Sequence, residues 1–265
     1  MVVRGVVPIV RAAFDAVVRP RRFVTFQQSA YGDSLSATAQ QLLSLVVVYL
    51  VNLALYALPL TVAGVGLQQA GQPPSGFVSV MAPLLGDPAA AWAVTVAFVR
   101  NCTFITVATG ITLVTFHVGV VATGGARGVV QSVHTVVYTT SAYLVVLFSG
   151  VWYLTNTDGL AAARTLVRNL QAAFVYWVID LLGSSLELPG GRPDSLVAGP
   201  LTTQGRWVLA ILCVTTLYYL LSLYLGARIN HRTGRTDAAT TVVAVALSPV
   251  LYVAGSVVAT TIGLI

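Results

Sequence analysis

The sequence predicts an all-α fold, a polytopic bundle of transmembrane helices, and three observations support this prediction. Of its 265 residues, 57% are hydrophobic and only 8% are charged, and the mean hydropathy is +0.85. Soluble domains carry about 25% charged residues, so this chain is too apolar to cover itself with a water-facing surface. Several stretches also reach the roughly 20 apolar residues that a helix needs to cross a membrane. We therefore expect one integral membrane domain over residues 1–265, in the cell membrane.

Residues 1–30 are expected to form a cytoplasmic amphipathic segment. Charged residues recur there at spacings that place them on one face of a helix, and such a face binds anionic lipid. Polar residues break the apolar stretches and no small-residue cleavage site follows, which argues against a secretory signal. The arginines of this segment, expected to contact lipid or a partner, are Arg4, Arg11, Arg19, Arg21 and Arg22.

Five stretches have the length and apolar content of membrane spans. They are residues 42–64, 102–121, 133–154, 207–225 and 238–265. The second follows Arg100 and Asn101. The apolar residues that precede Arg100 are too few to cross a membrane alone, so we expect them to extend the same helix beyond the bilayer.

Residues 155–205 are expected to be an extracytoplasmic insertion that contains an amphipathic helix over 159–188. Apolar residues recur there at helical spacing, while Arg164 and Arg168 fall on a separate stripe. A one-sided helix of this kind more often lies in the interface or packs on other helices than spans, although a sixth span here is the alternative. Asp180, an acid inside an apolar stretch, is expected to reach water or headgroups.

The arginine positions favour five spans with the N-terminus in the cytoplasm and the C-terminus outside. Cytoplasmic loops are enriched in basic residues, and this threading puts residues 1–30, Arg127 and the hairpin between the last two spans inside. Six spans would put that hairpin outside. Its arginines, expected to contact lipid or a partner, are Arg228, Arg232 and Arg235. Gly226 and Gly234 suit helix ends, and Asp237 suits a helix cap.

No recognisable chemistry appears along the chain, and we expect no catalytic, cofactor or metal site. Nucleophile, phosphate-loop and metalloprotease motifs are absent. His117, His134 and His231 all fall on the inner side in the five-span arrangement, so a shared metal or proton site competes with simple polar packing as their role. Cys102 and Cys213 lie at different depths, which argues against a disulfide between them.

Three local patterns together resemble the Yip family, the Ypt/Rab-interacting multi-pass membrane proteins. They are "RPRRF" before the first span, "GGARGVVQSVHTVVYTTSAYL" entering the third, and "LYLGARINHRTGRTDAATTVVAVALSP" before the last. The chain departs from the family at Ala142, where the pattern has a proline, and in the insertion of residues 155–205. The resemblance, to the prokaryotic type of the family, implies five spans and a cytoplasmic N-terminus. Eukaryotic relatives imply membrane-trafficking roles without catalysis, whereas prokaryotic relatives imply only a membrane protein and supply no mechanism.

The sequence therefore predicts a noncatalytic integral membrane protein that acts through helix packing, lipid contact or membrane-protein partners. Its expected partners are membrane lipids and other integral membrane proteins or a second copy of the chain. The arginines are too few and too dispersed for a nucleic-acid face. A transporter or channel subunit is the alternative. It requires a polar path at mid-membrane, for which the chain offers Asn52 and five threonines, Thr106, Thr109, Thr112, Thr215 and Thr216.

Overall fold

The regular elements in the described part of the chain are helices, as the composition predicts. The computed structural model describes residues 35–62, 66–67, 71–84, 86–140, 159–187, 191–192 and 203–263. The helices are α3 (Leu35–Val62), α4 (Ser75–Met81), α5 (Pro88–Ala122), α7 (Gly159–Leu181), α8 (Thr203–Asn230), α9 (Arg235–Ala246) and α10 (Ser248–Thr261). Residues 129–140 are also helical. The predicted amphipathic segment 1–30, with its five arginines, lies outside the described residues.

Two helical stretches are long and apolar enough to cross a membrane, by length and composition. One is α5, and the other is Arg235–Thr261, which comprises α9 and α10. α3 contains the predicted span 42–64 except for its last two residues, which follow Val62. α8 contains the whole of the predicted span 207–225. The predicted span 133–154 is described only as far as residue 140, where it is helical.

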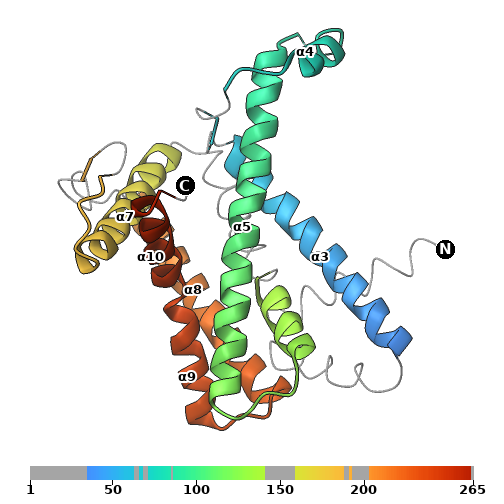
Figure 1. Cartoon of the computed structure of the whole chain (residues 1–265), viewed down its shortest axis with the longest axis vertical. Helices are drawn as coiled ribbons and strands as arrows, with labels where there is room; N and C mark the ends of the chain where they lie inside the picture. The colour runs from blue at the N-terminus through green and yellow to red at the C-terminus, as the bar shows by residue number, and fades with distance from the viewer. Residues whose placement is uncertain are drawn as a thin grey trace.

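Helix α5 extends well beyond the predicted span 102–121, as expected for the apolar residues before Arg100. It begins at Pro88, because the carboxylate of Asp87 accepts hydrogen bonds from the backbone N–H groups of Ala89 and Ala90, each at 3.0 Å. Its 35 residues make a rod of about 52 Å, against roughly 30 Å of hydrocarbon. Figure 1 shows α5 running the height of the molecule, with α4 against its N-terminal end.

The last helix is interrupted where the sequence places a proline. α9 ends at Ala246 and α10 begins at Ser248, one residue before Pro249. Proline has no backbone N–H and its ring crowds the preceding turn, which breaks the regular pattern of hydrogen bonds. The two helices nevertheless continue one another, since the N–H of Leu251 donates to the carbonyl of Leu247 at 3.1 Å.

The main hydrophobic core lies where α5, α8, α9 and residues 129–140 meet (Figure 1). Its fully buried members include Phe116, Val136, Leu223 and Ala238, one from each of these helices. A second cluster packs α3 on α5, and a third packs α7 on α10 through Tyr176, Ile179 and Val257. The main core therefore holds the site described below, and the other two clusters attach α3 and α7.

Outside its apolar core, the bundle also exposes many apolar side chains, which a soluble bundle rarely does. Apolar side chains along α5 are exposed, with Phe104 at 55%, Val114 at 61% and Val118 at 58%. Polar residues of the same helix, Asn101 and Thr112, are buried. Monomeric soluble proteins rarely expose contiguous apolar surfaces of this kind. Such a surface is suited to contact with lipid rather than water.

The sequence prediction for Gly226 was wrong. We expected this glycine at a helix end, but α8 continues to Asn230 and Gly226 lies inside it. A Cβ atom at this position would overlap the Cγ2 methyl of Thr135. The glycine is therefore required by close helix packing. Gly234 behaves as predicted, because it is the N-cap of α9 and its N–H donates to the Asp237 carboxylate at 3.1 Å.

Candidate functional site

A chain of hydrogen bonds links two of the three histidines through a buried serine. The Nδ1 atom of His117, on α5, lies 2.9 Å from the hydroxyl of Ser132. The same hydroxyl lies 3.2 Å from Nε2 of His231, in the turn after α8. The other ring nitrogen of His231, Nδ1, accepts the backbone N–H of Arg127 at 3.2 Å. Residues from four separate segments thus meet at one point, which we call the histidine–serine chain.

The backbone contact fixes the direction of the hydrogen bonds that His231 makes. Because Nδ1 of His231 accepts from Arg127, the proton of the neutral imidazole must be on Nε2. Nε2–H then donates to the Ser132 oxygen, and the second partner of that hydroxyl is Nδ1 of His117. The order begins at a backbone amide, which cannot release its proton, so the arrangement is a structural link and not a proton wire.

Burial holds His231 in the neutral form that these bonds require. Its side chain is 1% exposed, and the ring of Phe116 packs against it with the two ring centres 5.8 Å apart. The pKa of His231 is lowered from 6.5 to about 4, mainly by desolvation on burial and to a smaller extent by electrostatic interaction with His117 and Arg127. A protonated His231 would also present an N–H to the Arg127 N–H and lose that bond.

The site does not have the properties of a nucleophile. The Ser132 side chain is 0% exposed, so a substrate carbonyl or phosphoryl group has no route to its hydroxyl. A serine nucleophile needs both a neighbouring base and an accessible face, and only the base is present. The buried arrangement instead joins helices by satisfying polar groups that would otherwise be costly in a low-dielectric interior.

The hypothesis that all three histidines share a metal site was wrong. His134 lies two residues from Ser132, yet its ring stacks on Tyr138 with the centres 4.5 Å apart. Within the described ranges, no group of three or more His, Cys, Asp or Glu side chains is placed to hold a metal ion. His117 and His231 instead share the Ser132 hydroxyl, which is the polar packing that sequence analysis gave as the alternative role.

A second buried polar contact lies beside the first. The Nδ2 group of Asn230 donates to the Thr135 hydroxyl at 2.7 Å, and that hydroxyl donates to the carbonyl of Gln131 at 2.8 Å. Sequence analysis missed Ser132, Thr135 and Asn230. Serine and threonine are common throughout the spans, and only long-range packing distinguishes these three from the rest.

Of the arginines predicted to contact lipid, the three of the hairpin lie next to this site. Arg228 occupies the last turn of α8, Arg232 follows His231, and Arg235 is the first residue of α9. Arg232 adopts a φ of 53°, which is uncommon for a residue other than glycine. Arg232 and Arg235 are exposed, as is Arg127. The structure thus places the hairpin arginines together with Arg127 at the end of the bundle.

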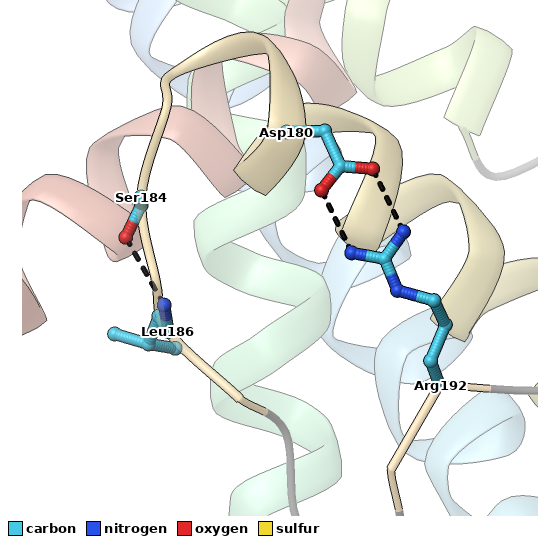
Figure 2. Close-up of polar contacts among 4 residues, drawn as sticks. All are labelled: Asp180, Ser184, Leu186 and Arg192. Atoms are coloured by element: carbon cyan, nitrogen blue, oxygen red, sulfur yellow. Dashed lines mark hydrogen bonds and ion pairs between the residues drawn. The ribbon is translucent and has the colours of Figure 1, made fainter.

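A different polar contact stabilises the loop that follows α7. Figure 2 shows the guanidinium of Arg192 facing the carboxylate of Asp180 through two hydrogen bonds, of 3.0 and 2.7 Å. The same guanidinium lies 4.7 Å from the ring centre of Tyr176. The hydrogen bonds from Arg192 hold the pKa of Asp180 below its usual range. The exposed position of Asp180 agrees with the sequence prediction that it reaches water or headgroups.

We expect Asp180→Asn to leave the stability of the protein unchanged. The side chains of Arg192 and Asp180 are 60% and 53% exposed, and exposed ion pairs contribute little because water screens them. The melting temperature in detergent micelles, compared with that of the wild-type chain, tests this. A large decrease would show that the pair is shielded from water in the folded protein, by lipid or by another part of the chain.

Two further predictions concern residues outside the histidine–serine chain. Cys102 and Cys213 are free, so the expectation of no disulfide between them is confirmed. Asn101, predicted to mark the start of a span, is buried instead and donates from Nδ2 to the Thr61 hydroxyl of α3 at 3.1 Å. This contact ties α3 to α5.

Comparisons with protein-family models, with curated proteins and with solved structures find no match to this chain. The resemblance to the Yip family therefore remains a prediction from short motifs.

Proposed function

We propose that this chain is a noncatalytic integral membrane protein with five spans, acting through helix packing and contact with lipid or membrane-protein partners. The observation that carries the proposal is the apolar outer surface of the bundle. Apolar side chains such as Phe104 and Leu217 are exposed at 55% and 67%, while Ser132 and His231 are buried. Hydrocarbon solvates the exposed residues without penalty, whereas water would not.

The threading is supported by the two connections that the histidine–serine chain joins. Residues 123–128 follow α5 and residues 231–234 follow α8, and the Arg127–His231 hydrogen bond holds them at the same end of the bundle. Five spans require these connections to share one side of the membrane. Both are basic, and basic connections remain in the cytoplasm. We therefore assign this end to the cytoplasm, with residues 1–30 on the same side and the C-terminus outside.

A role through packing agrees with how the buried polar groups are used. Ser132 and Asn230 use their polar groups for contacts between helices. The resemblance to the Yip family implies the same class of function. Lipids, other integral membrane proteins or a second copy of the chain are the partners that an exposed apolar surface fits.

The alternative, a transporter or channel subunit, requires hydroxyl groups that line a shared polar path. Three of the threonines considered for this path donate instead to carbonyls of their own helix. Thr106 donates to Cys102 at 2.8 Å, Thr109 to Ile105 at 2.8 Å, and Thr215 to Ile211 at 2.6 Å. Thr106 is also exposed. These bonds support packing within the bilayer over conduction through it.

Membrane integration and orientation are tested together by extraction and tag accessibility. We expect the expressed chain to resist alkaline carbonate extraction. An epitope inserted at residues 231–234 should be labelled only after permeabilisation, and one inserted at residues 71–74 should be labelled in intact cells. Release by carbonate would refute membrane integration. Labelling of the 231–234 epitope in intact cells would refute the five-span threading.

A further inference from the structure

Four arginines surround the point where the two cytoplasmic connections meet. Three belong to α8, α9 and the turn between them, and the fourth is Arg127 in the connection after α5. Arg228 lies one helical turn before His231, and Arg232 is the next residue. The N–H of Arg127 bonds directly to the His231 ring at 3.2 Å. The histidine–serine chain therefore gathers basic residues that are about 100 positions apart in sequence.

No carboxylate in the described ranges neutralises these arginines. The one ion pair in those ranges joins Arg192 to Asp180, which belong to the insertion after residue 154. Asp237 is the acid nearest in sequence to the hairpin arginines, and its carboxylate accepts the backbone N–H of Gly234. Positive charge without a partner at the edge of an apolar bundle attracts the anionic surface of the inner leaflet.

Close packing reinforces the union of the two connections. A Cβ atom on Gly125 would overlap the Cγ2 methyl of Thr233, so the backbone of the first connection lies directly against the second. Thr233 is itself buried. The contact depends on Gly125 of the first connection, which has no side chain, and on the buried His231 of the second connection. Separating the connections would divide the basic surface in two.

We propose that Arg127 and the hairpin arginines Arg228, Arg232 and Arg235 form one binding site for anionic phospholipid headgroups, assembled by the histidine–serine chain. The proposal rests on the proposed membrane integration and adds the chemical class of the ligand. Arginine suits it because the guanidinium binds phosphate oxygens in a bidentate manner. A zwitterionic headgroup has no net charge to attract the cluster, so the site distinguishes anionic from neutral lipids.

Competition between two lipids tests the ligand class. The purified full-length chain in detergent is given equimolar phosphatidylglycerol and phosphatidylcholine, and native mass spectrometry measures the bound lipids. We expect about a tenfold preference for phosphatidylglycerol. It should be lost in the variant Arg127→Gln/Arg232→Gln/Arg235→Gln and retained in the matched control Arg192→Gln. Equal binding of the two lipids, or loss of the preference in the control, would overturn the proposal.

A second arm separates lipid from free phosphate. Inorganic phosphate is added to the same lipid mixture in excess. If the ligand is the headgroup of an intact phospholipid, the preference for phosphatidylglycerol remains. Complete displacement of the bound lipid by phosphate would identify a soluble phosphate site and overturn the lipid assignment. Membrane integration is measured independently by carbonate extraction, so a chain that integrates but shows no lipid preference refutes only this inference.

The assembly of the site is tested without altering an arginine. His231→Phe keeps an aromatic ring beside Phe116 but removes the acceptor for the Arg127 N–H. Gly125→Val separates the connections by steric overlap and leaves the histidine intact. We expect both variants to lose most of the preference. Circular dichroism checks that each one folds, and if His231→Phe does not fold, Gly125→Val decides. A folded variant with the full preference would show that the histidine–serine chain does not assemble the site.

Discussion

Gly226→Ala is expected to destabilise the protein by about 3 kcal/mol, because the new methyl group would enter space occupied by Thr135. The Cβ of an alanine would overlap Cγ2 of that threonine and lie 3.2 Å from its Oγ1. Overpacking of a dense interior costs roughly 1–3 kcal/mol, and losing a buried hydrogen bond adds about 1–3 kcal/mol. Alanine has a higher helix propensity than glycine, so helix propensity alone would predict that Gly226→Ala stabilises the protein.

Thr135 cannot relieve the overlap by rotating. Its side chain is buried, and its hydroxyl accepts a hydrogen bond from Asn230 while donating to the carbonyl of Gln131. Turning the methyl group away from residue 226 would move the hydroxyl away from both partners. The helices would have to separate instead, and this would open the main hydrophobic core.

A second substitution restores the lost stability if this explanation is correct. Thr135→Ser deletes only the methyl group that overlaps and keeps the hydroxyl for Asn230, so Gly226→Ala/Thr135→Ser should recover most of the difference. Gly255→Ala is the matched control, since a Cβ there meets nothing within 4 Å. The free energy of unfolding is measured by titration with sodium dodecyl sulfate in mixed micelles. Equal stability of Gly226→Ala and Gly255→Ala would contradict the packing argument.

Some parts of the fold are determined by residues that are close together in the sequence, and these parts could be predicted. Apolar runs bounded by polar residues predicted α3, α8 and the final stretch of α9 and α10, and most of the predicted ends lie within a few residues of the observed ones. Such runs are recognisable because the thickness of the hydrocarbon layer sets the number of apolar residues that a span needs. The cap of α9 was also predicted, since Gly234 and Asp237 are only three residues apart. Features that depend on neighbouring residues are thus accessible from one sequence.

The packing contacts were not accessible in the same way. Glycine is common at helix ends, which is why Gly226 was predicted to lie at one. Only the position of Thr135 shows that Gly226 instead allows two helices to pack closely. Ser132 and His231 are 99 residues apart, and their distance depends on how three helices cross. His134 is closer in sequence to Ser132 than either partner is, yet it faces Tyr138. Periodicity places a residue on a face of its helix but does not say which helix lies opposite.

Acidification is expected to destabilise the protein through His231, by about 3 kcal/mol between pH 7 and pH 4. The pKa of this histidine is about 4 in the folded protein and 6.5 as its ordinary value, with burial as the main cause. Between these values the unfolded chain binds a proton that the folded chain does not. Stability from this group is therefore complete above pH 6.5, falls as the pH decreases toward 4, and changes little below that.

His231→Phe isolates this contribution, because phenylalanine has no group that titrates. The variant leaves the Arg127 N–H without its acceptor and removes one of the two partners of the Ser132 hydroxyl, so its stability at pH 7 is lower than that of the wild type. The informative quantity is the slope of the unfolding free energy against pH, measured in mixed micelles for both proteins. We expect the wild-type slope to be steeper between pH 6.5 and 4, and the two slopes to agree below that range.

The direction of the slope discriminates between two accounts of the histidine–serine chain. If His231 were held as an imidazolium by an unseen acid, its folded pKa would lie above 6.5 and stability would rise on acidification. If it is neutral, with Nδ1 accepting from Arg127 and Nε2–H donating to Ser132, stability must decrease. Parallel pH profiles for wild type and variant would mean that His231 is solvated rather than buried, and the link between the two connections would have no energetic basis.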